Sequence, residues 1–270
     1  MADKLKDNIY DSISEKILNL AADMIVYSKK IVVFTGSGLT STNETKSGKT
    51  GDKALVNKDV EDSFPKFVGD PSMHKRRSQW YNMFNMIESI KPNAVHYAIA
   101  DIHKMGKLYC VITQNVDGLH QKSGIPDDKV IELHGSLRWL KCPRCDKQYP
   151  ILEISKKIAA GIIEEPICDA CGGKLKSATT PLGEPPLSKE IRQAEEYSRS
   201  CDLFMLVGST LMIYPAAFIP IYAIESGAEL LIVNEGASSI DHKANLVVKK
   251  SIIKVLPHIV SIAKGKSGIS

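Results

Sequence analysis

Short apolar runs alternate with helical segments along most of this chain, and this alternation limits its possible folds more than any other feature. The apolar runs predict strands at 31–35, 108–113, 129–135, 202–208, 228–234 and 245–250. Helical periodicity predicts helices at 11–29, 92–106, 188–200, 215–226 and 252–264. Because apolar strands separated by helices form parallel sheets, we predict a Rossmann-like, doubly wound α/β fold.

The composition is that of a globular protein. Hydrophobic residues make up 43% of the chain and charged residues 24%, and the net charge is only +4. The lysines are scattered along the chain, which favours a solvated surface. Nothing in this pattern demands direct nucleic-acid binding.

One uncharged run, Leu203–Tyr222, has the length of a membrane span. Gly208-Ser209-Thr210 interrupts it, and Pro215 and Pro220 divide it further. We therefore expect a buried strand, a loop and the start of a helix, with no membrane partner. The first 16 residues carry several charges and no apolar core segment, so we expect no secretory signal and a cytoplasmic location.

Four of the six cysteines form two C-x-x-C pairs, Cys142 with Cys145 and Cys168 with Cys171. Two such turns supply four thiolates for tetrahedral zinc, and a reducing compartment favours metal binding over disulfides. Four thiolates leave no open coordination position, so we predict one structural zinc per chain. Two redox dithiols or a chance arrangement of cysteines are the alternatives. Cys110 and Cys201 lie in or beside predicted strands, and we expect them in the core.

Polar clusters follow the predicted strands at their carboxyl ends. The clusters are Gly36-Ser37-Gly38, Thr113–His120, Glu132–Gly135, Gly208-Ser209-Thr210 and Asn234-Glu235. Because the carboxyl ends of parallel strands share one edge of a sheet, these groups should converge on one ligand crevice. The first cluster has the form of a phosphate-binding turn, which is a weak signal when it stands alone.

Two side chains in these clusters allow a structural and a functional interpretation. His134, taken alone, fits a core histidine, but its place between a strand end and a glycine favours general acid or base chemistry. Asp117 fits a turn cap, or it could grip a ribose or an amide group together with Asn115. The remaining histidines indicate no role on their own: His74, His96, His103, His120, His242 and His258.

Taken together, the motifs resemble those of the sirtuins, the NAD-dependent protein deacylases. The matching motifs are Gly36–Thr40, Thr113–His120, Ile131–Gly135, the two C-x-x-C pairs, Gly183-Glu184 and Gly208–Ala217. Their order and spacing extend the resemblance from about residue 12 to residue 260.

The resemblance implies a large domain and a small domain with NAD between them. The large Rossmann-like domain would comprise 1–43, 89–137 and 177–270. A helical insertion at 44–88 and a zinc ribbon at 138–176 would form the small domain.

The resemblance also implies a reaction and roles for individual residues. The acyl-lysine oxygen would attack C1′ of the ribose as nicotinamide leaves, and the acyl group would end on ADP-ribose. His134 would act as general base, Asn115 would orient the ribose and a water, and Asp117 would hold the nicotinamide carboxamide. The expected cofactor-binding residues are Gly36, Ser37, Gly38, Thr40, Lys49, Gln114, Asn115, Asp117, Gly208, Ser209, Thr210, Asn234 and Glu235.

The chain departs from the family pattern after the glycine turn. Sirtuins carry a Gly-Ile-Pro-Asp-Phe-Arg segment, which an ungapped alignment places against Glu44–Lys49. Lys49 keeps a cation without the planar fork of arginine, and Gly48 cannot cover a nicotinamide ring. We expect a mobile loop here. Two lesser departures are the order Gly208-Ser209-Thr210 and the segment Thr179–Leu182, where the family has an apolar, peptide-pairing strand.

These observations leave three functions open. The first is an NAD-dependent protein lysine deacylase acting on an acylated-lysine protein. The second is an ADP-ribosyltransferase or NAD glycohydrolase on the same scaffold. The third is a non-catalytic NAD-binding module, against which the retained His134, Asn115 and Asp117 argue.

Overall fold

The computed structural model describes residues 2–42, 88–180 and 188–268. The helical insertion predicted at 44–88, Lys49 and the Gly183-Glu184 motif lie outside these residues. Within residues 2–42, the structure describes the side chains of residues 15–39 only, so Thr40 is placed by its backbone alone.

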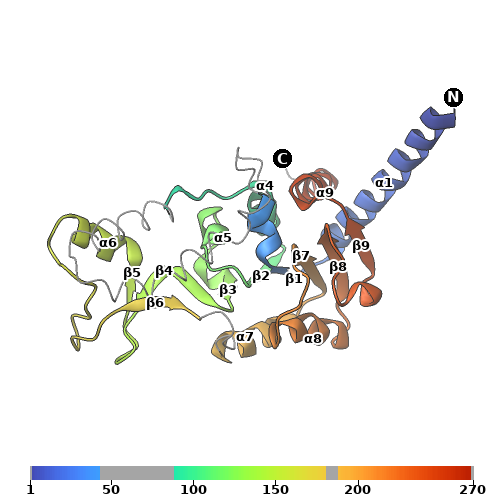
Figure 1. Cartoon of the computed structure of the whole chain (residues 1–270). Helices are drawn as coiled ribbons and strands as arrows, with labels where there is room; N and C mark the ends of the chain where they lie inside the picture. Colours follow the sequence, from blue (N-terminus) through green and yellow to red (C-terminus); the bar gives the residue numbers. More distant parts are fainter. Residues whose placement is uncertain (1, 43–87, 181–187, 269–270) are drawn as a thin grey trace.

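A parallel sheet of six strands organises the larger part of the molecule, as predicted (Figure 1). Its strand order is β3-β2-β1-β7-β8-β9, and every neighbouring pair is parallel. The strands are β1 (Ile31–Thr35), β2 (Leu108–Thr113), β3 (Val130–Glu132), β7 (Leu203–Val207), β8 (Glu229–Asn234) and β9 (Leu246–Lys249). All residues of β1 and β7 are buried, because helices cover both faces of the sheet.

Two groups of helices cover the two faces of the sheet (Figure 1). On one face lie α1 (Ala2–Tyr27), α4 (Ala94–Lys104) and α9 (Ile252–Lys266). On the other lie α7 (Ser188–Arg199) and α8 (Ile219–Glu225). The first helix begins earlier than the predicted 11–29, and Figure 1 shows its N-terminal end projecting beyond the sheet.

The uncharged run Leu203–Tyr222 forms the expected strand, loop and helix start. It comprises β7, a short 3-10 helix η4 (Ala216–Phe218) and the first residues of α8. Within the described parts of the chain, no helix is both long enough and apolar enough to cross a membrane.

A second, antiparallel sheet of three strands has the order β5-β4-β6. Its strands are β4 (Gly135–Lys141), β5 (Gln148–Pro150) and β6 (Lys176–Thr179), with α6 (Ile151–Ala159) packed against them. This sheet has an apolar cluster of its own, separate from the two clusters that flank the parallel sheet. The division into two domains stays a prediction, but β4 and β6 both belong to this second sheet.

The chain passes from one sheet to the other at His134. The strand predicted at 129–135 ends at Glu132, because the backbone turns at Gly135, whose φ is +75°, and begins β4 there. A side chain at Gly135 would place its Cβ 2.0 Å from the Ala178 carbonyl oxygen. The chain comes back beside this corner, since Gly135 pairs with Thr179 and Thr180 N donates to the His134 carbonyl at 2.8 Å.

Candidate active site

The glycine turn after β1 packs backbone to backbone on the turn after β7. Gly38 N donates to the Gly208 carbonyl oxygen at 2.9 Å. An added Cβ at Gly36 would lie 2.8 Å from Ser209 Cβ, and one at Gly38 would lie 2.6 Å from Gly208 O. Glycine is therefore required at both positions for this close approach.

Hydrogen bonds join four strand ends at the same edge of the parallel sheet. Ser209 Oγ donates to Gln114 Oε1 at 3.1 Å, and Asn234 Nδ2 donates to the Ser209 carbonyl at 3.1 Å. Gln114 N donates to the Thr35 carbonyl at 3.0 Å. The structure thus brings together the ends of β1, β2, β7 and β8, as the polar clusters predicted. Ser37, Thr210 and Glu235 are exposed on these turns.

A buried network of hydroxyls and an imidazole lies directly behind this edge. Thr35 Oγ1 donates to Thr113 Oγ1 at 2.8 Å, and His120 Nε2 lies 3.0 Å from Thr35 Oγ1. Thr113 Oγ1 accepts from Asn115 N at 3.0 Å. The network therefore fixes the backbone of Asn115 to the ends of β1 and β2.

A second histidine extends this network. The His96 and His120 rings lie 5.1 Å apart between centroids, and His96 Nδ1 lies 2.8 Å from Asn93 Oδ1 at the start of α4. Burial lowers the pKa of His96 to about 4 and that of His120 well below its usual value, so both rings are neutral near pH 7.

The sequence placed Thr113 and His120 in the polar cluster expected at the ligand crevice but indicated no individual role for either, and none for His96 or Thr35. A signal was present, because His96 falls on the apolar stripe of its helix, beside Val95 and Ile99. The partners could not be named, since the hydrogen-bonded threonines are 78 residues apart in the chain.

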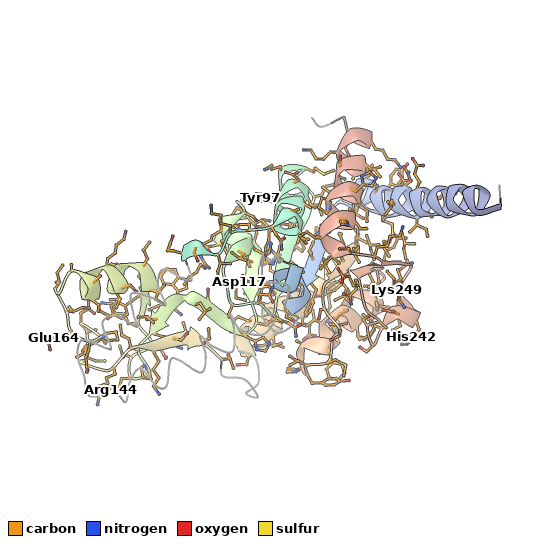
Figure 2. All side chains as sticks on the ribbon, turned by 45° about the horizontal axis from the view of Figure 1, so that its top comes forward. Tyr97, Asp117, Arg144, Glu164, His242 and Lys249 are labelled. Carbon is orange, nitrogen blue, oxygen red and sulfur yellow. The ribbon has the colours of Figure 1, made fainter. Side chains whose placement is uncertain are left out.

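The loop after β2 carries Asn115 and Asp117, both buried. Asp117 Oδ1 accepts from Leu119 N at 3.0 Å, so this carboxylate does cap a turn. The Val116 carbonyl accepts from Leu137 N of β4 at 2.8 Å, and the Val116 side chain joins the apolar cluster of the second sheet. Figure 2 shows Asp117 near the middle of the molecule, between Arg144 on one side and Lys249 on the other.

His134 occupies the corner between β3 and β4 and is half-buried. Its Nε2 atom is buried and has no hydrogen-bond partner among the residues that the structure describes. Burial lowers the pKa of His134 below its usual 6.5. The imidazole is therefore neutral near pH 7, which is the form that can accept a proton.

The four paired cysteines converge as predicted. Their sulfur atoms all lie within 4.8 Å of one another, which fits a single tetrahedral zinc ion. Gly173 allows this approach, since an added Cβ there would lie 2.9 Å from Cys142 Sγ. The set is compatible with zinc, and thiolates are donors that zinc prefers. Cys110 and Cys201 are buried in the core of the parallel sheet, also as predicted.

Comparison with known proteins identifies the family. A sequence model of the Sir2 family matches residues 46–215, which is more than half of the chain. The chain belongs to the Sir2 family. The match begins downstream of the Gly36 turn, inside the segment in which the chain departs from the sirtuin pattern.

Individual Sir2-family relatives match over nearly the whole chain. The "NAD-dependent protein deacylase 2" of Archaeoglobus fulgidus is 35% identical over 255 residues, 93% of this chain and 97% of the relative. The "NAD-dependent protein deacetylase" of Rhodopseudomonas palustris is 34% identical over 240 residues, 87% of this chain and 92% of the relative.

A solved Sir2 structure shares the fold. It is Sir2Af2 bound to a myristoylated histone peptide, which is 33% identical, with a TM-score of 0.68 and coverage of 94% of this chain and 99% of that one. The predicted resemblance to the sirtuins is therefore confirmed.

Proposed function

We propose that this chain is an NAD-dependent protein lysine deacylase, which transfers an acyl group from lysine to ADP-ribose and releases nicotinamide. The observation that carries the proposal is His134. Its imidazole is neutral, its buried Nε2 has no partner in the described part of the chain, and it follows β3 at the edge where the glycine turn lies. The names of its Sir2 relatives agree with this function.

The residues at this edge fit NAD. Bound NAD would supply the ADP-ribose acceptor and nicotinamide as the leaving group. Because Gly38 N already donates to Gly208, we assign the pyrophosphate contact to Gly36, to the exposed Ser37 and to the residues that follow, including Thr40. Gly208, Ser209, Thr210, Asn234 and Glu235 would line the adenosine side, and Lys49 would add a cation.

Four side chains would act at the nicotinamide side. His134 would take the proton of a ribose hydroxyl, for which a neutral imidazole is suited at neutral pH. Asn115, whose backbone is fixed by Thr113, would orient the ribose and a water. The bond from Leu119 N holds the Asp117 carboxylate in place for the nicotinamide carboxamide, and Gln114 would contact the nicotinamide ribose.

The partner would be an acylated-lysine protein or peptide. A solved Sir2 relative binds a myristoylated histone peptide, which supports a peptide substrate here. One zinc ion per chain, held by Cys142, Cys145, Cys168 and Cys171, would be structural. We also propose a cytoplasmic location, since four zinc-binding thiols need a reducing compartment.

The test is an incubation with NAD, with and without an acetyl-lysine peptide. Peptide-dependent release of nicotinamide together with O-acetyl-ADP-ribose is the expected result. Consumption of NAD without peptide would instead support a glycohydrolase or an ADP-ribosyltransferase. Binding of NAD without any consumption would contradict both enzyme functions and favour a non-catalytic module.

A further inference from the structure

Arg138 belongs to the three-stranded sheet, but its ion pairs reach residues beside the parallel sheet. Its Nη2 atom lies 3.1 Å from Glu132 Oε2, at the end of β3. Its Nη1 atom lies 2.7 Å from Asp127 Oδ1, in the short 3-10 helix η3 (Asp127–Lys129). The Arg138 side chain is 24% exposed and that of Glu132 only 13%, so this pair is largely shielded from water.

The aliphatic part of Arg138 covers the loop that carries Asp117. Gly118 has φ of +69°, and an added Cβ there would lie 2.5 Å from Arg138 Cδ. With its amide oriented to satisfy both groups, Gln121 of α5 (Leu119–Lys122) accepts from Arg138 Nη2 at 2.9 Å and donates to the Gly118 carbonyl at 3.3 Å. Together with the Leu137–Val116 backbone bond, these contacts fasten the loop to β4.

The Arg138–Glu132 pair also joins the two strands that lie on either side of the His134 corner. Glu132 is the last residue of β3, and Arg138 lies in β4, just beyond the turn at Gly135. The second carboxylate oxygen, Glu132 Oε1, is buried with no partner among the described residues. Arg138 is therefore the main group that keeps this carboxylate charged, because burial raises its pKa while the guanidinium opposes that rise.

We propose that Arg138 is a positioning residue, which holds the His134 corner and the Asp117 loop in the arrangement needed for NAD turnover. It contacts both segments and joins them to one strand. A displacement of the reacting groups by about 1 Å can slow a reaction by about 100-fold. The proposal rests on the proposed function for the roles of His134 and Asp117.

The decisive variants separate the charge of Arg138 from its packing. Arg138→Met keeps an aliphatic stem over Gly118 and removes the guanidinium. We expect it to lower kcat at least about tenfold while the KM for the peptide stays within about twofold, because only the reacting groups shift. In Arg138→Met the buried Glu132 carboxylate has lost its arginine partner. The double variant Glu132→Gln/Arg138→Met removes this unpaired charge, so its kcat should be at least about threefold higher than that of Arg138→Met.

Lys141→Met is the matched control. Lys141 lies on the same strand and pairs with Asp146 at 2.9 Å, but its partner is 80% exposed. This variant should keep the wild-type kcat, because an exposed ion pair of this kind positions nothing at the site.

Hydrogen–deuterium exchange gives a readout that does not depend on activity. In Arg138→Met, we expect faster exchange at residues 115–122 and 132–138, with unchanged exchange in β7 and β8 and unchanged zinc content. If the wild-type protein turns over no NAD, the proposed function fails, while exchange still decides whether Arg138 holds these segments. Wild-type kcat with wild-type exchange in Arg138→Met overturns the inference, as does a double variant no better than Arg138→Met.

Discussion

Burial away from water determines the charge of the three histidines near the sheet edge. An imidazolium loses its hydration when it is buried, so His96, His120 and His134 all favour the neutral form. They differ in their surroundings, because His96 and His120 are almost fully buried and each has a side-chain hydrogen-bond partner at one ring nitrogen, whereas His134 is only half-buried. At this scale, His134 is suited to accept a proton and the other two to hold structure.

For His134 we expect replacement by alanine to lower kcat by at least about 100-fold, the range typical of a lost general base, with NAD binding changed less than about threefold. In the wild-type enzyme, the acid limb of kcat/KM should lie below pH 6.5, since the pKa of His134 is lowered and its neutral form persists there. His258→Asn, on the exposed part of α9, is the control. A fully active His134→Ala variant would contradict the assigned role.

The buried pair, His96 and His120, should make stability depend on pH. In the unfolded chain each imidazole takes up a proton near pH 6.5, whereas the folded His96 resists this down to about pH 4. Below pH 6.5, the free energy of unfolding should therefore decrease by about 1.4 kcal/mol for each pH unit and for each histidine. Urea unfolding between pH 4.5 and 7.5 measures this slope. We expect His120→Asn to reduce it and His258→Asn to leave it unchanged.

At the scale of elements, the corner between β3 and β4 depends on one glycine. The φ of +75° at Gly135 and the nearby Ala178 carbonyl both exclude a side chain. Two strands of different sheets meet here, so a shift at this residue moves both. The corner is therefore sensitive to any substitution at Gly135.

Gly135→Ala should lower the free energy of unfolding by about 3 kcal/mol or more, because the strained backbone and the clash with Ala178 act together. Gly124→Ala is the matched variant, with φ of +103° and open space around it, and should cost about 1 kcal/mol. Chemical denaturation of the three proteins provides the comparison. Equal costs for the two variants would show that packing against β6 is unimportant.

The elements also show what could be predicted from sequence. The strands of the parallel sheet and the four cysteines were predictable, since apolar periodicity and C-x-x-C spacing are local signals. The His120 network was not, because Thr35 and His120 are 85 residues apart and meet only through the strand order. The Arg138 contacts were missed for another reason: their partners are near in sequence, but the contacts depend on the turn at Gly135, where the chain passes from one sheet to the other.

At the scale of the whole molecule, two sheets with separate apolar clusters meet around the loop of Asn115 and Asp117. The parallel sheet has extensive cores on both faces, whereas the three-stranded sheet has one small cluster. A sheet of this size needs further stabilisation, and the four convergent thiols offer it through a metal.

Metal analysis should accordingly find about one zinc per chain. Removal of the metal by a chelator should increase hydrogen exchange in β4, β5 and β6 and leave β1, β7 and β8 protected, because the larger cores do not depend on zinc. Cys168→Ala should act in the same way, with Cys201→Ala, outside the cysteine cluster, as the control. A metal-free protein with a fully protected three-stranded sheet would contradict a structural zinc.

The hydrogen bond from Thr180 N to the His134 carbonyl means that the chain leaves and rejoins this corner at adjacent points. Residues 135–179 therefore form a segment that starts and ends at this corner, and the length of this segment does not alter the order of the parallel strands. Leu137 and Arg138 lie in this segment and contact the Asp117 loop, so an exchange of the segment has to keep both residues. Chimaeras joined at residues 134 and 180 that keep both residues would test whether the parallel sheet folds with a different three-stranded sheet.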